Sequence, residues 1–321
     1  GAFPDIDSLF ANAASDDPLV RLQTHRGLTH SLFFAPVLGP LWGWALWRWK
    51  RSRSTRAELE LPYWPWIILI TCALWSHPLL DYCTHYGTQL LSPFTDRRFA
   101  LPAISIIDPR YTLTLLFGLI LTSVMHRKHT RLISSAALLV STAYILLGLK
   151  TNLEAEAWAR KDLESKGIAA SEVHAFPTLF QLPHRRLLAR TLETDYVGFV
   201  TMSEPCEIGW QPQIRYDGPE AGDIRNSPEG RIFEWFTDGL TTAYREDNRL
   251  ILTDLRYGFT TDPRQGNWTL SSLITEAGEL SRPEYVRRPR PKPSRKNIVA
   301  LWEEAYPDSC SRFTGTLELD Y

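Results

Sequence analysis

LISSAALLVSTAYILLGLKTNLEAEAWARKDLESKG (132–167) changes character at Lys150. The 18 residues before Lys150 contain no charged side chain, and a helix of about 20 apolar residues crosses the hydrocarbon core of a bilayer. The residues after it have helix-forming composition and end at Gly167, a helix stop signal. We therefore predict one helix that leaves the membrane and continues in water. The change divides the chain into a membrane-embedded domain (1–150) and an α+β domain (151–321).

Three further apolar stretches precede this one: SLFFAPVLGPLWGWALW (31–47), LPYWPWIILITCALWSHPLL (61–80) and YTLTLLFGLILTSVM (111–125). Each has about 15 to 20 residues, and Trp or Tyr lies at several ends, as at membrane interfaces. We predict an α-helical membrane domain with four membrane helices. The alternative is a set of buried helices in a large soluble core, which the Pro pair of the first stretch and the short third stretch favour. A further helix is expected upstream, because the chain starts without Met directly before PDID.

The charged loops predict the orientation. RWKRSRSTR (48–56) and HRKHTR (126–131) are strongly basic, and basic loops face the cytoplasm. Alternation along the chain then places residues 151–321 on the periplasmic side of a bacterial inner membrane, as the external domain of a multi-pass protein. The formal net charge of -1 and a pI near 6.8 provide no basic field for nucleic acid, so we expect none as a partner.

The second apolar stretch ends in an unusual polar pattern. His77, Asp81 and His85 follow one another at intervals of four in WSHPLLDYCTHYG (75–87). On a helix this spacing places side chains on one face, about 5 to 6 Å apart between Cβ atoms. Such a face predicts a metal site, although a single His-x-x-x-Asp step also suits a structural hydrogen bond.

Other polar motifs fall at the same predicted side of the membrane: AFPDIDSL (2–9), HRGLTHS (25–31) and SIIDPRY (105–111). Ionisable groups near lipid are costly unless they are paired or bind metal, so we predict one shared site. The predicted metal ligands are Asp5, Asp7, His25, His30, His77, Asp81 and Asp108, with His85 as a candidate extra ligand.

Mixed His and Asp ligation suits zinc, with manganese or iron(II) as alternatives. Two or more such ions activate water and hold a phosphoester, so hydrolysis is the expected reaction. Simpler interpretations stay open for two motifs, because PDID and Asp108 before Pro109 are both typical helix caps. A transporter is disfavoured, since the ionisable groups lie at helix ends rather than at mid-helix.

PDID, HRGLTHS, HPLLDYCTHYGTQLLSPFTDRRFAL and IIDPRYT resemble the motifs of the YdjM-like family of bacterial inner-membrane metal-dependent hydrolases. The resemblance covers residues 1–150, and TDLRYG (253–258) resembles the tail of longer members. It implies that the seven ligands named above form the polar positions of the site, whereas His85 departs from the family pattern. A more remote similarity, to zinc-dependent phospholipases C and related nucleases, implies a phosphoester substrate.

The expected function is hydrolysis of a phosphoester in a lipid or lipid-linked substrate at the outer membrane interface. Asp81 and Asp108 are the candidate catalytic residues, with the roles of general base and bridging ligand both open. The candidate phosphate contacts are Arg26, Arg97, Arg98 and Arg110. The alternative is a nonenzymatic membrane protein with a structural metal site and a partner-binding external domain.

The external domain is predicted from its aromatic and β-branched segments. We expect strands at 193–203, 231–246, 249–260 and 315–321, and a helix at 297–306 after the basic linker 287–296. EDN (246–248) is expected to turn one hairpin. Cys206 and Cys310 both fall in this domain, where a disulfide and two free buried thiols are both compatible with the sequence.

Overall fold

The computed structural model describes residues 2–53, 62–179, 182–203, 205–216, 218–275, 278–288 and 294–306. The chain divides into two compact units, Gly1–Leu101 and Pro102–Tyr321. The predicted boundary at Lys150 lies inside one helix of the second unit, α6 (Thr130–Ser165).

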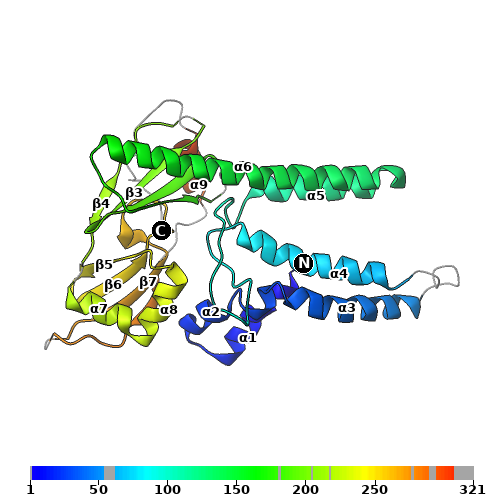
Figure 1. The fold of residues 1–321 in the computed structure, drawn as a ribbon, viewed down its shortest axis with the longest axis horizontal. Helices are drawn as coiled ribbons and strands as arrows, with labels where there is room; N and C mark the ends of the chain where they lie inside the picture. The colour runs from blue at the N-terminus through cyan, green and yellow to red at the C-terminus, as the bar shows by residue number, and fades with distance from the viewer. Residues whose placement is uncertain are drawn as a thin grey trace. The chain divides into compact units, whose positions relative to one another are not determined.

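The first unit is helical and is drawn in blue to cyan in Figure 1. Its elements are η1 (Phe3–Asp5), α1 (Ile6–Ala14), α2 (Pro18–Thr24), η2 (Leu28–His30), α3 (Phe34–Arg51) and α4 (Trp64–Tyr82). The side chain of Asp17 caps α2 by accepting a hydrogen bond from the backbone N–H of Leu19 at 2.9 Å. Pro18 then occupies the first helical position, where a missing N–H costs nothing.

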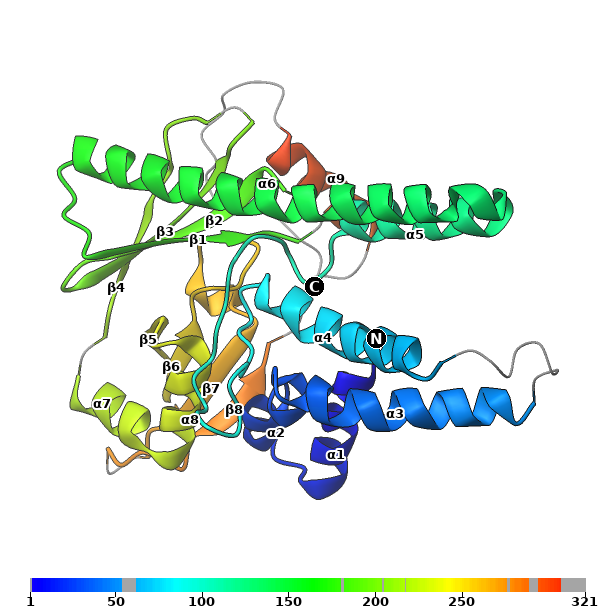
Figure 2. The ribbon, with the colours of Figure 1, turned by 45° about the vertical axis from the view of Figure 1, so that its right-hand side comes forward.

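Helices α3 and α4 form an antiparallel pair (Figure 2) that depends on two glycines of α3. A Cβ atom at Gly39 would lie 2.9 Å from the Cα atom of Thr71, and one at Gly43 would lie 2.5 Å from the Cα atom of Ile67. Only glycine permits so close an approach of the two backbones. The pair therefore holds α4, and the polar residues at its end, in a fixed register against α3.

The segment after α4 returns over the turn between α2 and η2. Gln89 donates its backbone N–H to the carbonyl of Arg26 at 3.0 Å, and its side-chain amide to the carbonyl of Gln23 at 2.8 Å. The backbone N–H of Leu32 donates to the carbonyl of Leu90 at 2.9 Å. These bonds fix the HRGLTHS segment against the end of α4.

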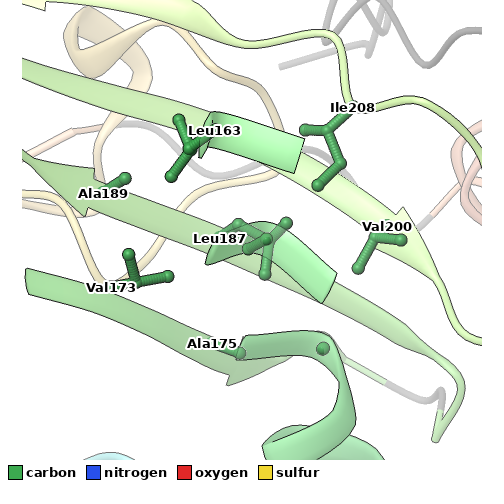
Figure 3. Close-up of a cluster of buried hydrophobic side chains, with 9 residues drawn as sticks. Leu163, Val173, Ala175, Leu187, Ala189, Val200 and Ile208 are labelled. Carbon is green, nitrogen blue, oxygen red and sulfur yellow. The ribbon is translucent and has the colours of Figure 1, made fainter. Parts of the chain in front are cut away.

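The second unit begins with a helical hairpin of α5 (Pro109–Val124) and α6, joined by η4 (Arg127–His129). The C-terminal half of α6 packs on a four-stranded antiparallel sheet of β1 (Glu172–Pro177), β2 (His184–Arg190), β3 (Thr194–Thr201) and β4 (Gln211–Ile214), in that order. Figure 3 shows this core, in which Leu163 of α6 lies among Val173, Leu187 and Ile208. The part of α6 after Lys150 thus covers one face of the first sheet and contributes Ala155, Ala159 and Leu163 to its hydrophobic core.

A second antiparallel sheet follows, in the order β5 (Thr241–Glu246), β6 (Arg249–Asp254), β7 (Trp268–Leu273) and β8 (Glu284–Arg287). The remaining helical elements along the chain are α7 (Pro219–Asn226), α8 (Pro228–Thr237), η5 (Pro263–Gln265) and α9 (Arg295–Ala305). Leu240 and Leu255, which flank β5 and β6, share a buried cluster with Leu188 and Val197 of the first sheet.

The prediction of four membrane helices is wrong. Within the described residues, one helix, Arg127–Ser165, is long and apolar enough to cross a membrane. Helix α3 carries Arg48, Lys50 and Arg51 in its last turn, and the last two turns of α4 include His77 and Asp81. Helix α5 has 16 residues, which at about 1.5 Å each fall short of the roughly 30 Å hydrocarbon core.

In the C-terminal half, one predicted strand is wrong and another lies outside the described residues. Residues 231–246 do not form one strand, because Ser227 caps α8 and the chain is helical to Thr237 before β5 begins. The predicted strand at 315–321 and Cys310 lie outside the described residues. Cys206 is disulfide-bonded, whereas Cys72 and Cys83 are free. The predicted helical continuation to Gly167, the strand at 193–203 and the EDN turn are confirmed.

Candidate metal centre

Three segments of the first unit bring metal-ligating side chains together. Asp5 ends η1, His30 ends η2, and His77 lies in α4. One ligand atom from each of these residues lies within 4.8 Å of the others. Asp81 stands one helical turn after His77 and adds a second carboxylate to the group. Residues far apart in the sequence thus meet at one point, which we call the donor cluster: Asp5, His30, His77 and Asp81.

The donor atoms are spaced as zinc ligands would be. Asp5 Oδ1 lies 3.2 Å from His77 Nε2 and 3.5 Å from His30 Nε2. Asp81 Oδ2 lies 3.3 Å from His30 Nε2 and 3.5 Å from His77 Nε2. Four tetrahedral ligands at about 2.0 to 2.2 Å from zinc are separated by about 3.3 to 3.6 Å. The same separations suit hydrogen bonds when an imidazole is protonated, so geometry alone allows both.

The burial of His30 Nε2 and Asp81 Oδ2 favours a cation bound between them. His30 is fully buried, and within the described chain its Nε2 atom and the Oδ2 atom of Asp81 have no hydrogen-bond partner. They lie 3.3 Å apart without hydrogen-bond geometry. Buried polar atoms are rarely left unsatisfied, because desolvation costs about 1 to 3 kcal/mol. A cation bound by both atoms would satisfy them, so the residues present fit a divalent metal ion.

Asp7 lies behind His30 rather than in the donor cluster. Its Oδ2 atom is 3.1 Å from His30 Nδ1 and accepts hydrogen bonds from Thr29 Oγ1 at 3.1 Å and the Arg26 backbone N–H at 3.0 Å. Its Oδ1 atom is 3.2 Å from His25 Nδ1. A carboxylate on the far nitrogen of a ligand imidazole fixes the tautomer and the ring orientation. The structure thus places Asp7 and His25 behind the ligand atoms.

The same contacts determine the charges of His30 and Asp7. Burial by itself disfavours the charged form of His30, but the Asp7 and Asp81 carboxylates on either side of the ring stabilise that form and raise the pKa of His30 to about 9. Burial would likewise raise the pKa of Asp7, yet hydrogen bonds from His25 and His30 hold it well below its usual range. Without a metal ion, His30 carries the proton that the surrounding carboxylates attract.

Arg26 clamps the site from the other side. It has a left-handed backbone (φ 59°), is 7% exposed, and places Nη2 3.0 Å from Asp81 Oδ1. Its Nη1 atom donates to Thr84 Oγ1 at 3.1 Å, and its guanidinium lies 4.6 Å from the Tyr86 ring centroid. Arg26 thus occupies one oxygen of Asp81 and leaves the other facing the two imidazoles.

The other predicted phosphate contacts lie elsewhere. Arg98 donates to the carbonyls of Tyr86 and Gly87, and Arg97 lies over the ring of Phe99. Arg110 belongs to the second unit, where it lies over the rings of Trp302 and Tyr306.

His85 does not share the helical face of His77 and Asp81. Helix α4 ends at Tyr82, so the helical spacing of four residues no longer aligns His85 with Asp81. His85 is buried in the turn that follows the helix.

Asp108 lies in the second unit and caps α5. Its Oδ1 atom accepts hydrogen bonds from the backbone N–H groups of Arg110 at 3.0 Å and Tyr111 at 3.2 Å. The hydroxyl of Tyr144 lies 3.1 Å from Oδ1 and 2.9 Å from Oδ2. Asp108 therefore makes the contacts of a helix N-cap, as one of the two interpretations of IIDPRYT predicts.

Sequence reasoning missed the roles of Thr29, Thr84 and Tyr86, and it assigned Arg26 to phosphate. The signal that could have identified Arg26 is its place between His25 and Gly27, in a tight turn that brings its backbone N–H to Asp7. Nothing in the spacing indicates that its side chain reaches Asp81, 55 residues later.

Comparison with known proteins gives one match. Residues 1–154, just under half of the 321-residue chain, match the family model described as YdjM inner membrane protein. No curated protein and no solved structure matches the chain. The match indicates an inner-membrane location, in agreement with the candidate membrane helix found among the described residues, and names no activity. The part of the chain that holds the donor cluster is thus similar to the YdjM inner membrane protein family.

Proposed function

We propose that the donor cluster binds a divalent metal ion, zinc by preference, and that the protein is a membrane-bound hydrolase of a phosphoester in a lipid or lipid-linked substrate. The observation that carries the proposal is the convergence of two imidazole nitrogens and two carboxylate oxygens at 3.2 to 3.5 Å. Zinc bound by His and Asp lowers the pKa of coordinated water and attracts phosphoryl oxygens, which is the chemistry that such a donor set serves.

The residues around the donor cluster have different roles in this proposal. Asp7 orients His30, and Arg26 holds Asp81 while balancing its negative charge. The Asp5 side chain is 47% exposed and that of His77 is 21% exposed, so these two residues line the open side from which substrate and water enter. Asp81 remains a candidate general base as well as a ligand. Hydrolysis would form a bond from water oxygen to phosphorus and break the bond from phosphorus to the leaving alcohol oxygen.

Apolar side chains beside the cluster support a lipid substrate. Leu9 and Phe10 follow Asp7 in α1 and are 68% and 66% exposed. Leu28, which precedes His30 in η2, is 58% exposed, and Leu79, between His77 and Asp81, is 46% exposed. An exposed apolar surface around a charged site suits a molecule with a phosphorylated head and an acyl tail. The match to an inner membrane family supports the same class of substrate.

The competing proposal is a structural metal site in a nonenzymatic protein. It is favoured by the number of donors, because four protein ligands can close a tetrahedral shell and leave no position for water. Metal content and turnover must therefore be measured together.

The test uses detergent-purified protein: wild type, His77→Ala, Asp81→Ala and the control His126→Ala, which removes an exposed imidazole far along the chain from the cluster. Metal is measured by elemental mass spectrometry. Phosphate release is measured from phosphatidic acid, and alcohol release from a phosphodiester lipid. We expect near-stoichiometric metal and turnover in wild type and in the control, and loss of both in the two cluster variants. Metal without turnover of either ester would favour the structural site, and absence of metal after reconstitution would refute both.

A further inference from the structure

A second chemical feature of the first unit lies where α3 ends and α4 begins. From Phe34 to Arg53 the chain has four cations and no carboxylate, and Pro62 to Trp75 has no charged residue. Tryptophans are concentrated in the same two stretches. The donor cluster uses none of these residues, so the feature calls for a separate explanation.

Each of the four cations lies over a tryptophan ring: Arg48 over Trp44 at 5.9 Å, Lys50 over Trp66 at 5.1 Å, Arg51 over Trp47 at 5.0 Å and Arg53 over Trp49 at 4.8 Å. Three pairs are four residues apart along the chain, and the Lys50 pair joins α3 to α4. We call these eight residues the tryptophan–cation cluster.

The cluster faces solvent rather than a protein core. Trp44 is 50% exposed and Trp49 is 56% exposed, and the four cations are exposed. A water-exposed protein surface rarely carries so many large rings, whereas Trp beside Arg and Lys is the composition of a membrane interface. Stacking also fixes each guanidinium by its face, and the N–H groups on its edge stay able to donate to phosphate oxygens.

Along one face of α3 the exposed side chains change in type from one helical turn to the next. Val37, Leu41 and Trp44 are 68%, 61% and 50% exposed, and Arg48 follows at the same helical spacing. Aliphatic, aromatic and cationic side chains thus succeed one another along this face. A bilayer presents its hydrocarbon, its interface and its anionic headgroups in that order.

We propose that the tryptophan–cation cluster binds the headgroups of anionic phospholipids in the membrane. Charge complementarity requires an anionic partner, because all four charged residues of the cluster are cations. The exposed aliphatic residues that continue it along α3 favour a lipid over a nucleic acid, which has no apolar tail to cover them. Similarity of residues 1–154 to an inner membrane family makes a bilayer the available partner.

The test measures lipid selectivity of the full chain reconstituted in phosphatidylcholine vesicles. Spin-labelled phosphatidylglycerol and spin-labelled phosphatidylcholine serve as probes, and the ratio of their association with the protein is read from the immobilised spectral component. The variant replaces Arg48, Lys50 and Arg51 by Gln. The matched control replaces Arg127, Lys128 and Arg131 by Gln, which removes three cations that stack on no aromatic ring among the described residues.

Each cation near an anionic surface strengthens association about fivefold. Wild type should therefore favour phosphatidylglycerol by at least about fivefold. The α3 variant, which keeps Arg53, should lose most of this preference, and it should lose more than the control, whose three cations stack on no ring among the described residues. Raising the salt concentration to about 1 M should remove the preference of wild type, a readout that does not depend on how the variant folds. An α3 variant with undiminished preference would refute the proposal. If such a variant also binds a single-stranded oligonucleotide more weakly than wild type does, the cations would be assigned to nucleic acid instead.

Discussion

His30 and Asp7 are joined through the imidazole Nδ1 atom, which lies 3.1 Å from Asp7 Oδ2, while Nε2 on the opposite edge of the ring lies 3.3 Å from Asp81 Oδ2. One histidine thus has a carboxylate on each side. Asp7 Oδ2 also accepts hydrogen bonds from the Arg26 backbone N–H and the Thr29 hydroxyl, whereas Asp81 is held through its other oxygen, Oδ1, by the Arg26 guanidinium.

Asp7→Asn should weaken zinc binding without abolishing it. The amide oxygen can still accept a hydrogen bond from the Nδ1–H group, but the loss of charge lowers the basicity of His30, and such partners typically contribute 10- to 100-fold in metal affinity. Competition with a fluorescent zinc chelator would measure the change beside Asp81→Ala. Equal losses in the two variants would make Asp7 a ligand, contrary to its place behind the ring.

Arg26→Gln should lower the stability of the metal-free protein and leave metal affinity intact or higher. The substitution leaves the Asp81 carboxylate buried without its cation, and breaking a buried pair costs about 3 to 5 kcal/mol. Thermal unfolding with and without zinc would show the loss and its partial recovery by the ion. Arg26→Lys is the control, since it keeps the charge. A variant of wild-type stability with a raised KM alone would return Arg26 to the role of a phosphate contact.

Gly43→Ala should separate α3 from α4. The new Cβ atom would lie 2.5 Å from Ile67 Cα and 2.7 Å from Ile67 N, and backbone atoms cannot move aside as a flexible side chain does. Overpacking of this kind costs about 1 to 3 kcal/mol. Because the pair fixes α4, metal affinity should fall together with the melting temperature. Ala45→Leu, at an exposed position of the same helix, is the matched control and should change neither.

The sequence predicted the donor cluster better than the fold around it. His30, His77, Asp5 and Asp81 were recognisable because His and Asp at the ends of apolar segments are costly without a partner. Which of the seven candidates touch one another depends on chain reversals with no spacing rule. The Arg26 turn puts Asp7 behind His30, and the end of α4 at Tyr82 removes His85 from the helical face.

Counting apolar residues overestimated the number of membrane helices for a related reason. Helices α3 and α4 pair closely at Gly39 and Gly43, but charged or ionisable residues occupy their last turns, and these interrupt the apolar runs. The aromatic content of RIFEWFTDGLTTAYRE (231–246) predicts a single strand. The Ser227 hydroxyl, which accepts a hydrogen bond from the Gly230 N–H at 2.9 Å, starts a helix there instead.

His184 should make the second unit less stable in acid. Burial lowers the pKa of this imidazole to about 3, assisted by the neighbouring Arg185, whereas the unfolded chain takes up the proton near pH 6.5. Between these values the unfolded state binds more protons, so stability falls as pH falls, by about 2 kcal/mol at pH 5. His184→Asn keeps an acceptor for the Thr201 hydroxyl, which lies 2.8 Å from His184 Nδ1. This variant should flatten the dependence of the melting temperature on pH from 7 to 5, and an unchanged slope would assign the acid sensitivity to another group.

The 36 residues of α6 run from Thr130 to Ser165 without a break, and Leu163 near the far end belongs to the core of the first sheet. At about 1.5 Å per residue this is a rod of about 54 Å. A domain attached by a flexible linker would sample many orientations relative to its anchor. The first sheet packs on the candidate membrane helix itself and has none of that freedom. Tilting α6 by a given angle therefore tilts the sheet by the same angle, and a change in bilayer thickness that tilts the helix would act on the folded domain directly.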